Sequence, residues 1–252
     1  MPAIRLAIEG PVARITMNRP EVLNAGDPGW VAELNDAVAR IGARADLRVA
    51  VITGAGRAFS TGVDLKSLAA GQMTLAHFVA WEDAMTAIER MPLPFIAAIN
   101  GHCLGGGLQI ALVCDYRLAC ADASIGLPAV KECLIPSMAL YRLPRLIGAA
   151  RARELILTGD PITAPRAEQY GLVDRVVPAA DFSRAVDECL ERFLALPATS
   201  VRVSKRLLAR AFDLPFDAFR REMEAGLRLC LDSAEHRAAM DEIRRRRKGP
   251  AR

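Results

Sequence analysis

A run of three glycines between two apolar segments constrains the fold of this chain most. The run lies in Asn100-Gly101-His102-Cys103-Leu104-Gly105-Gly106-Gly107-Leu108-Gln109, which follows the apolar segment 95–99 and opens another at 108–113. This order predicts a strand, a glycine turn and the start of a helix. Glycines let a ligand approach the backbone closely, and the N–H groups of a first helical turn have no partner within the helix and favour negative charge. We therefore expect an oxyanion-binding turn, with close helix–strand packing as the structural alternative.

A dinucleotide-binding turn is the other interpretation of a glycine-rich loop after a strand. That fingerprint has the spacing G-x-G-x-x-G and an acidic residue about 20 positions further on. Here the glycines are consecutive, and Ala129 stands near the expected acidic position. The spacing therefore argues against a dinucleotide site.

Strand and helix patterns alternate along the first three quarters of the chain. A hairpin is predicted at 4–8 and 12–17, short buried strands at 49–52, 95–99, 116–120 and about 124–127, and helices at 28–41, 75–91, from 106 and from about 137. No strand is predicted after about Pro178, where helices are expected at 182–196, 200–212, 216–231 and 234–247. The prediction is an α/β core over residues 1–195 and a helical C-terminal region over 196–252.

Composition limits the class of protein. The 252 residues are 52% hydrophobic, enough for a large core, and the net charge of +4 is too weak and dispersed to indicate a nucleic-acid partner. The one charge run, Arg244-Arg245-Arg246-Arg247-Lys248, is expected to be a solvated tail, with a phosphate or subunit contact as the alternative. No apolar run approaches the 18 or so residues of a membrane span, so no membrane partner is expected.

The cysteine pattern indicates a reduced, cytoplasmic protein. All six cysteines lie in mostly apolar contexts without C-x-x-C spacing or paired histidines: Cys103, Cys114, Cys120, Cys133, Cys189 and Cys230. They are expected to be core residues, and no metal site is expected. The first residues lack a long apolar segment, so no signal peptide is expected.

A second glycine loop follows the first buried strand of the core, over residues 54–66: Gly54-Ala55-Gly56-Arg57-Ala58-Phe59-Ser60-Thr61-Gly62-Val63-Asp64-Leu65-Lys66. Two glycine loops, each after a buried strand, can present two backbone N–H groups to one oxygen. That arrangement stabilises a thioester enolate or a tetrahedral oxyanion.

With these two loops the chain resembles the crotonase superfamily, also called the enoyl-CoA hydratase/isomerase family. The resemblance also covers Asn18-Arg19-Pro20-Glu21-Val22-Leu23-Asn24-Ala25, residues 157–164 and residues 167–177, and thus nearly the whole chain. It implies a spiral of ββα units with a helical C-terminal region, assembled as a homotrimer or a dimer of trimers.

The resemblance also implies an acyl-CoA substrate and assigns residues to it. The backbone N–H groups of Val63 and Gly106 are the expected oxyanion donors, and Gly62 and Gly105 lie beside them in the CoA-binding loops. Arg57 and Lys66 are expected near the nucleotide, and Lys205 is a candidate phosphate contact. Coenzyme A enters only as part of the substrate, and no other cofactor is expected.

Two positions depart from the pattern of the family's hydratases, which use two glutamates. Here those positions hold Gln109 and Ala129. Water addition needs a base and an acid, and neither an amide nor a methyl group can supply them, so simple hydration is not expected. Gln109 either orients water, hydrogen-bonds a polar acyl group, or is a helix residue bonded locally. The family's glycine-rich stretch after Pro136 is replaced by 137–141, where Ser137 suits an N-cap.

Several residues are candidates to replace the missing acids. Glu132 lies three positions after Ala129, and Tyr141 is a possible proton or hydrogen-bond donor. His77, Trp81, Glu82 and Asp83 lie on the helix after the first loop, with core packing or exposure as their alternative. His102 is expected to pack beside its turn, and Asp64 and Asp115 to fix loop geometry through backbone N–H groups.

The sequence therefore predicts an acyl-CoA enzyme that stabilises an oxyanion and acts as an isomerase, hydrolase, decarboxylase or atypical lyase. A non-catalytic acyl-CoA binding protein is the main alternative. A scaffold that binds no CoA is a third.

Overall fold

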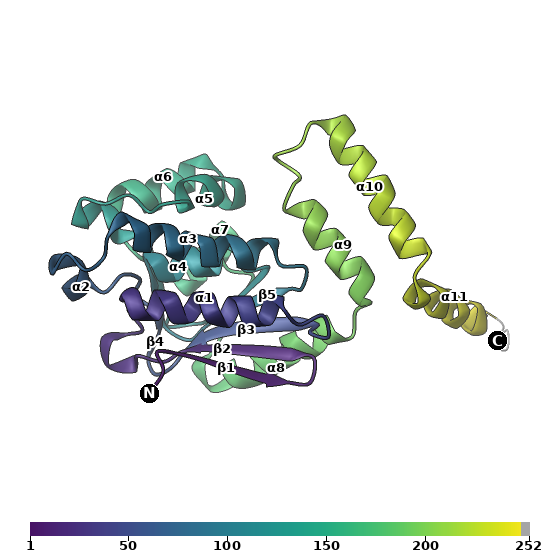
Figure 1. Cartoon of the computed structure of the whole chain (residues 1–252), viewed down its shortest axis with the longest axis horizontal. Coiled ribbons are helices and arrows are strands. Elements are labelled where there is room, and N and C mark those ends of the chain that lie inside the picture. Colours follow the sequence, from purple (N-terminus) through teal and green to yellow (C-terminus); the bar gives the residue numbers. More distant parts are fainter. Residues whose placement is uncertain (248–252) are drawn as a thin grey trace.

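The computed structural model describes residues 1–247 and has two β-sheets surrounded by helices (Figure 1). The larger sheet has six strands in the order β1-β2-β3-β5-β7-β10. The hairpin of β1 and β2 is antiparallel, and the other neighbours are parallel. Its strands are β1 (Ile4–Glu9), β2 (Val12–Met17), β3 (Val49–Gly54), β5 (Phe95–Ile99), β7 (Tyr116–Cys120) and β10 (Arg175–Val177).

The smaller sheet has four short strands in the order β4-β6-β8-β9. β4 (Ala58–Ser60), β6 (His102–Leu104) and β8 (Ser124–Gly126) are parallel, and β9 (Ile162–Thr163) is antiparallel to β8. β4 and β6 lie inside the two segments that the sequence predicts as glycine turns. Strands of three residues are too short to show an alternating pattern, which is why the sequence does not reveal them.

The same ββα turn repeats along the chain. The pairs β3–β4, β5–β6 and β7–β8 each add one strand to both sheets. The first pair leads into α2 (Leu65–Ala69) and α3 (Leu75–Arg90), and the second into α4 (Gly106–Leu112). The third leads through a short 3₁₀ helix (Pro128–Glu132) into α5 (Ala139–Ile147) and α6 (Ala149–Thr158). This repetition confirms the predicted α/β spiral of ββα units.

Helix α1 (Pro28–Gly42) begins directly after a capping aspartate. The Asp27 side chain accepts from Trp30 N at 2.9 Å, and Pro28 occupies the first turn, where its missing N–H costs nothing. The buried face of α1 packs against α3, and the rings of Trp30 and Trp81 lie 4.6 Å apart. The predicted helix at 28–41 is confirmed.

Strand β3, inside the larger sheet, is buried on both faces. Ala50 and Ile52 of β3 join the main core, whereas Val49 and Val51 pack on the other face with α8 (Phe182–Leu194). Burial of both faces is the reason why this strand is a continuous apolar run without alternation. α7 (Ala164–Tyr170) precedes the last strand of this sheet.

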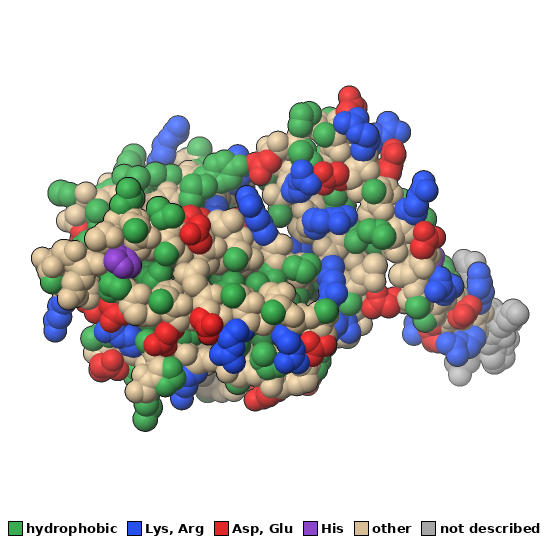
Figure 2. Space-filling model, in the orientation of Figure 1, with side chains coloured by type: hydrophobic (Ala, Val, Ile, Leu, Met, Phe, Trp, Pro, Cys, Tyr) green, Lys and Arg blue, Asp and Glu red, His purple; other side chains and the backbone are tan. Residues whose placement is uncertain are grey.

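Three helices follow the core: α9 (Ala198–Leu208), α10 (Phe216–Leu231) and α11 (Ala234–Arg247). α10 and α11 lie away from the sheets (Figure 1), and lysine and arginine side chains gather over them (Figure 2). The helix predicted at 200–212 ends earlier, at Leu208, before turns that lead to Pro215. The boundary expected at 195/196 falls between α8 and α9.

The basic run near the end of the chain lies on α11. Arg244, Arg245 and Arg246 are exposed and pair with Asp241 or Glu242. Lys248 lies outside the described residues. None of the helices within residues 1–247 has the length and apolar character needed to cross a membrane.

The expectation that all six cysteines are core residues is wrong for two of them. Cys133 is exposed and Cys230 is half-buried, while the other four are buried, and none forms a disulfide in the described part of the chain. Cys133 ends a 3₁₀ turn with a φ of +53°, and that turn directs it outward.

Candidate active site

The two glycine loops lie directly against each other. A Cβ atom on Gly62 would lie 2.6 Å from the backbone nitrogen of Gly106, and one on Gly107 would lie 2.2 Å from the carbonyl oxygen of Ser60. Gly62 and Gly105 also have positive φ angles, of +89° and +52°. Only glycine satisfies both the approach and the backbone angles, so the glycines serve to bring the loops into contact.

Both expected donor groups are free and border the same cavity. Neither the Val63 N–H nor the Gly106 N–H donates a hydrogen bond to any group within residues 1–247. Both residues line a cavity of about 410 Å³, a size typical of small-molecule sites. Much of its lining is apolar and comes from distant parts of the chain, including Val22, Leu68, Phe78, Met85, Leu134 and Ile135.

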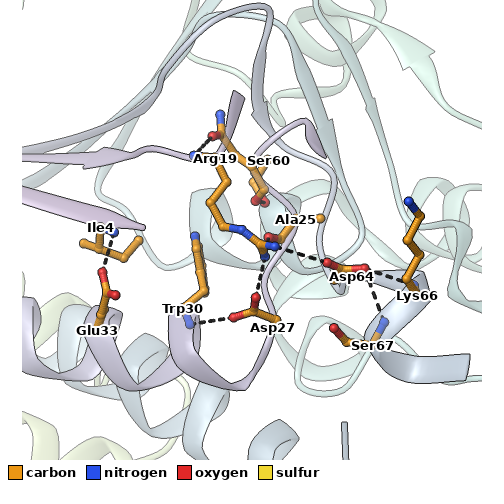
Figure 3. Close-up of polar contacts among 11 residues, drawn as sticks. Ile4, Arg19, Ala25, Asp27, Trp30, Glu33, Ser60, Asp64, Lys66 and Ser67 are labelled. Atoms are coloured by element: carbon orange, nitrogen blue, oxygen red, sulfur yellow. Dashed lines mark hydrogen bonds and ion pairs between the residues drawn. The ribbon is translucent and has the colours of Figure 1, made fainter. Parts of the chain in front are cut away.

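Polar side chains hold the first loop in place (Figure 3). Arg19 Nη1 lies 2.9 Å from Asp27 Oδ2, and Arg19 Nη2 lies 3.4 Å from Asp64 Oδ2. Asp64 Oδ1 accepts from the backbone N–H groups of Lys66 at 3.0 Å and Ser67 at 3.3 Å. These bonds confirm the predicted role of Asp64 in fixing the loop, directly beside the Val63 N–H.

Asn24 connects the first loop to the preceding segment and was not singled out by sequence reasoning. Its side chain is fully buried, accepts from Arg19 N at 2.8 Å, and donates to the carbonyl oxygens of Ala55 at 2.9 Å and Ala58 at 2.8 Å. Its φ is +58°, a left-handed conformation that asparagine tolerates better than most residues. In the sequence, this role of Asn24 was indicated only by the presence of an asparagine in the Asn18–Ala25 segment that carries the resemblance.

Trp81 supports the second loop from α3. A Cβ atom on Gly106 would lie 2.7 Å from Trp81 Cζ2, and one on Gly26 would lie 2.6 Å from Trp81 Cη2. The ring is 3% exposed, lines the cavity and packs on Trp30. The indole therefore packs so close to the backbone of Gly26 and Gly106 that only glycine fits at these two positions.

The other three candidates on α3 have structural roles or face solvent. His77 Nδ1 lies 3.2 Å from Thr74 N and 3.0 Å from Thr74 Oγ1 at the start of the helix. Glu82 pairs with buried Arg142 at 2.6 Å, and Asp83 is exposed. None of them lines the cavity, which contradicts a catalytic role for these three residues.

The two positions that the resemblance assigns to the hydratase glutamates border the cavity, and so does one nearby carboxylate. Gln109, Ala129 and Glu132 all line it. Gln109 is 9% exposed and its Oε1 has no hydrogen-bond partner among the described residues, which contradicts the interpretation of a locally bonded helix residue. Glu132 is exposed and makes no hydrogen bond or ion pair within residues 1–247.

The structure contradicts a role for Tyr141 in proton transfer at the cavity. Tyr141 is 40% exposed and does not line the cavity. Its hydroxyl donates to Asp213 and the guanidinium of Arg145 lies 3.3 Å from its ring centroid. Ser137 is not the N-cap of the following helix either, because α5 starts after Met138, and Ser137 has a φ of +39° and lines the cavity.

The prediction that Lys205 binds a CoA phosphate is wrong. Its Nζ donates to the carbonyl oxygens of Leu93 at 2.9 Å and Ile88 at 3.3 Å and lies 2.7 Å from Asp115 Oδ2. Asp115 in turn accepts from Phe95 N at 2.7 Å, which confirms its predicted structural role. Burial raises the pKa of the Asp115 carboxyl, and Lys205 offsets part of that rise. All three lysine donors are therefore used inside the fold.

The remaining predicted residues lie on or near the first loop. Lys66 is exposed and lines the cavity, whereas Arg57 is exposed but does not line it. His102 is half-buried on β6, opposite Ala58 of β4, in agreement with the packing role expected for it. Cys103, next to it, is fully buried, and burial raises the pKa of its thiol, so it stays protonated.

Comparison with known proteins agrees with this arrangement. Residues 7–248 match the family model described as enoyl-CoA hydratase/isomerase. The (E)-benzylidenesuccinyl-CoA hydratase of Thauera aromatica is 36% identical over 228 residues, which cover 85% of each chain. The enoyl-CoA hydratase structure from Bacillus anthracis has a TM-score of 0.91 at 31% identity and covers 97% of this chain and 96% of that one. The enoyl-CoA hydratase structure from Mycobacterium smegmatis has a TM-score of 0.92 at 25% identity, covering 98% and 97%.

This chain belongs to the enoyl-CoA hydratase/isomerase family. Its place in the crotonase superfamily, expected from the glycine loops, is thereby confirmed. Within this family member, Gln109 and Ala129 occupy the positions at which the resemblance places the hydratase glutamates. No group of three or more histidine, cysteine or acidic side chains within the described residues is arranged to hold a metal ion.

Proposed function

We propose that this family member acts on acyl-CoA thioesters and stabilises an enolate or tetrahedral oxyanion with the backbone N–H groups of Val63 and Gly106. One observation carries the proposal: both N–H groups lack a partner within residues 1–247 and border one cavity of about 410 Å³. Such preorganised donors are typically worth about 10²–10³ in rate each, because they meet the developing charge without reorganisation.

Glu132 is the proposed proton-transfer group. It lies three residues after Ala129 in the 3₁₀ helix Pro128–Glu132, in which side chains three residues apart project from the same side. The other carboxylate that lines the cavity, Asp64, is already bonded to Arg19 and to the start of α2. Glu132 is thus the lining carboxylate left for acid–base chemistry.

The proposed step is proton abstraction beside the thioester carbonyl. The C–H bond at C2 breaks and the proton moves to the Glu132 carboxylate. The C–H electron pair forms a C1–C2 double bond, and the carbonyl π pair moves onto the oxygen held by Val63 and Gly106. In a 3-enoyl thioester, return of that proton to C4 moves the double bond to C2–C3 and completes an isomerisation with a single carboxylate. Hydrolysis, decarboxylation and an atypical lyase reaction use the same oxyanion stabilisation and are distinguished by product analysis.

Hydration by two glutamates is not part of the proposal. It requires one group to activate water and another to deliver a proton to carbon, and each contributes about 10²–10⁴ in rate. Gln109 and Ala129 can do neither. We expect crotonyl-CoA to be hydrated far below ordinary hydratase rates, and rapid turnover would contradict this part of the proposal.

Coenzyme A is proposed to bind along the first loop as part of the substrate. Lys66 is exposed at the cavity, and Arg57 is exposed on the same loop, so both are available to the nucleotide phosphates. The backbone of Gly62 and Gly105 lets the thioester pass close to the two donors. The proposal requires no other cofactor.

A homotrimer or a dimer of trimers is the proposed assembly. Leu208, Phe212 and Phe216, on and between α9 and α10, are 72%, 76% and 79% exposed, and Leu227 is 53% exposed. Large apolar side chains on helices away from the core are typical of surfaces buried between subunits. Light scattering coupled to size exclusion measures the subunit number. The free, mostly buried thiols favour the cytoplasm as the compartment.

Exchange of the C2 protons of butyryl-CoA for deuterium tests the proposal for any of these reactions. Nuclear magnetic resonance is expected to show exchange catalysed by the wild-type enzyme and a loss of about 10²–10⁴ in Glu132→Gln. Glu191→Gln, which removes an exposed carboxylate on α8, is the matched control and should leave exchange unchanged. Exchange that persists in Glu132→Gln would exclude Glu132 as the base.

A non-catalytic acyl-CoA binding protein is the second candidate, favoured by the absence of both glutamates. It predicts that calorimetry detects acyl-CoA binding while no thioester undergoes exchange or conversion. Gly106→Pro, which removes one donor, would then abolish binding without an activity to lose. If neither CoA nor any acyl-CoA shifts the melting temperature, that result would instead support a scaffold that does not bind CoA.

A further inference from the structure

A buried cluster of one arginine and two glutamates connects α5 to α3. Arg142, on α5, is 8% exposed. Its Nη2 atom lies 2.6 Å from Glu82 Oε1 and 2.9 Å from Glu89 Oε2, and its Nε donates to both oxygens of Glu89 at 3.2 Å. Both glutamates lie on α3. Because a guanidinium is planar and rigid, these bonds fix the direction of approach of the two helices as well as their distance.

The two elements that Arg142 connects carry different parts of the cavity lining. α3 contributes three apolar side chains, Phe78, Trp81 and Met85. The segment 128–138, which leads directly into α5, contributes several residues, among them Glu132, Leu134, Ile135 and Ser137. Trp81 packs against the backbone of Gly106, the second oxyanion donor. The Arg142 cluster therefore connects the helix beside that donor to the segment that carries the proposed base.

The segment 128–138 has few other attachments. Apart from Pro136, none of its residues is buried. Its hydrogen bonds to groups within residues 1–247 remain inside the segment or continue into α5, except for the exposed ion pair of Lys131 with Asp160, and exposed pairs contribute little. α3, in contrast, is held by the buried side chains Trp81, Ala84, Met85 and Ile88. Loss of the Arg142 bonds should therefore move the segment and leave α3 in place.

We propose that Arg142 is a positioning residue for Glu132. By fixing α5 against α3, it determines where the segment 128–138 holds the Glu132 carboxylate relative to the Gly106 N–H. Neither Arg142 nor its two glutamate partners line the cavity, so the effect is on proton transfer and not on CoA binding. A misplacement of about 1 Å can cost about 10² in rate. This inference rests on the proposed function, because it takes Glu132 to be the proton-transfer group.

Exchange of the C2 protons of butyryl-CoA, measured over a range of thioester concentrations with the full-length enzyme, tests the inference. Arg142→Met removes the guanidinium and keeps an apolar side chain. We expect kcat for exchange to fall by about 10–10²-fold while KM stays within about 2-fold of wild type. Glu89→Gln keeps the shape of one partner and removes its charge, so it should lower kcat in the same direction by a smaller factor.

Arg117→Met is the matched control for the loss of a buried guanidinium. The Arg117 side chain is 7% exposed, its Nη2 lies 2.9 Å from Asp174 Oδ2, and it does not line the cavity. This variant should be less stable than wild type but keep kcat within about 2-fold, because the base is not displaced. An equal fall of kcat in Arg117→Met and Arg142→Met would show that exchange follows stability alone and would overturn the inference.

A double-mutant cycle tests whether Arg142 acts through Glu132. The residual exchange rate of Glu132→Gln, measured with proportionally more enzyme, is compared with that of the variant carrying both Glu132→Gln and Arg142→Met. If Arg142 only positions the Glu132 carboxylate, the second change should alter this rate by about 2-fold or less. Losses that multiply in the double variant would overturn the inference.

The outcomes distinguish this inference from the function on which it rests. If Arg142→Met does not fold, Glu89→Gln is used in the same comparisons. An unchanged kcat in the folded variants, or a rise in KM without a fall in kcat, would overturn the inference and leave the proposed function standing. If the wild-type enzyme shows no exchange that depends on Glu132, the proposed proton transfer fails, and the inference fails with it.

Discussion

The two glycine loops are held in place by different balances of the same contacts. Hydrogen bonds and ion pairs of Arg19, Asn24, Asp27 and Asp64 dominate at the first loop. Close packing dominates at the second loop, because Cβ atoms on Gly106 and Gly107 would overlap Trp81 and the Ser60 backbone. Hydrogen bonds and ion pairs can be removed one at a time, each with a limited loss of stability. An added Cβ atom at a close backbone contact instead forces the two loops apart. The two loops should therefore respond differently to substitution.

Gly107→Ala should have the largest effect. Its Cβ would lie 2.2 Å from the carbonyl oxygen of Ser60, and a backbone atom can yield only if both loops separate. We expect a loss of about 3 kcal/mol in the free energy of unfolding, the upper end for overpacking. Exchange at C2 should fall by about 10²–10³, because the donor moves.

Urea unfolding and the exchange assay measure these two effects of Gly107→Ala. Gly29→Ala is the control, since its Cβ would lie 3.4 Å from Asp27 Oδ1, an ordinary contact. Wild-type stability in Gly107→Ala would contradict the steric account of the second loop.

Asn24→Ala should have the next largest effect, on stability. It leaves the carbonyl oxygens of Ala55 and Ala58 without the Asn24 donor and places alanine at a φ of +58°. Unpaired buried groups cost about 1–3 kcal/mol, so the urea midpoint should fall with an unchanged slope. Asn18→Ala, which removes an exposed bond to Pro2 O, should change stability by about 0.5 kcal/mol or less. Equal losses of stability in Asn24→Ala and Asn18→Ala would show that the hydrogen bonds of Asn24 are not needed to hold the first loop.

Asp64→Ala should cost about 1 kcal/mol. The change removes the N-cap of α2, typically worth 0.5–2 kcal/mol, and the 3.4 Å ion pair with Arg19. Thermal unfolding measures the loss, with Asp36→Ala as the exposed comparison because its pair with Arg40 is long, at 3.7 Å. If Asp64→Ala and Asp36→Ala have the same melting temperature, Asp64 does not stabilise the loop.

Val63→Ala should change catalysis least. The donor is the backbone N–H, which the substitution keeps, so exchange at C2 should stay within about 3-fold of wild type. Stability should fall by about 1 kcal/mol, because Val63 is half-buried and loses two methyl groups. Gly106→Ala is the paired test at the other donor, where the added Cβ would meet Trp81 at 2.7 Å. Similar exchange rates in Val63→Ala and Gly106→Ala would show that an added side chain disturbs the second loop no more than a shortened one disturbs the first.

Local patterns predicted much of the fold. The apolar strands at 49–52 and 95–99 and the amphipathic helix at 28–41 could be identified because an apolar run and a helical period both lie within short segments. The strands β4 and β6 could not, since three residues show no period and pair only across the spiral. Lys205 and Tyr141 were misplaced for a related reason: their partners, Asp115 and Asp213, lie 90 and 72 residues away.

By itself the sequence determined the alternation of strands and helices, the two glycine loops and the absence of glutamate at positions 109 and 129. These are properties of neighbouring residues, and local chemistry is enough to read them. Only the tertiary structure decided that both loops border one cavity, that Glu132 lines it while Tyr141 does not, and that buried polar atoms of Gln109 and Trp81 have no partner within residues 1–247. Those facts depend on which distant segments pack together, and packing is a property of the whole chain.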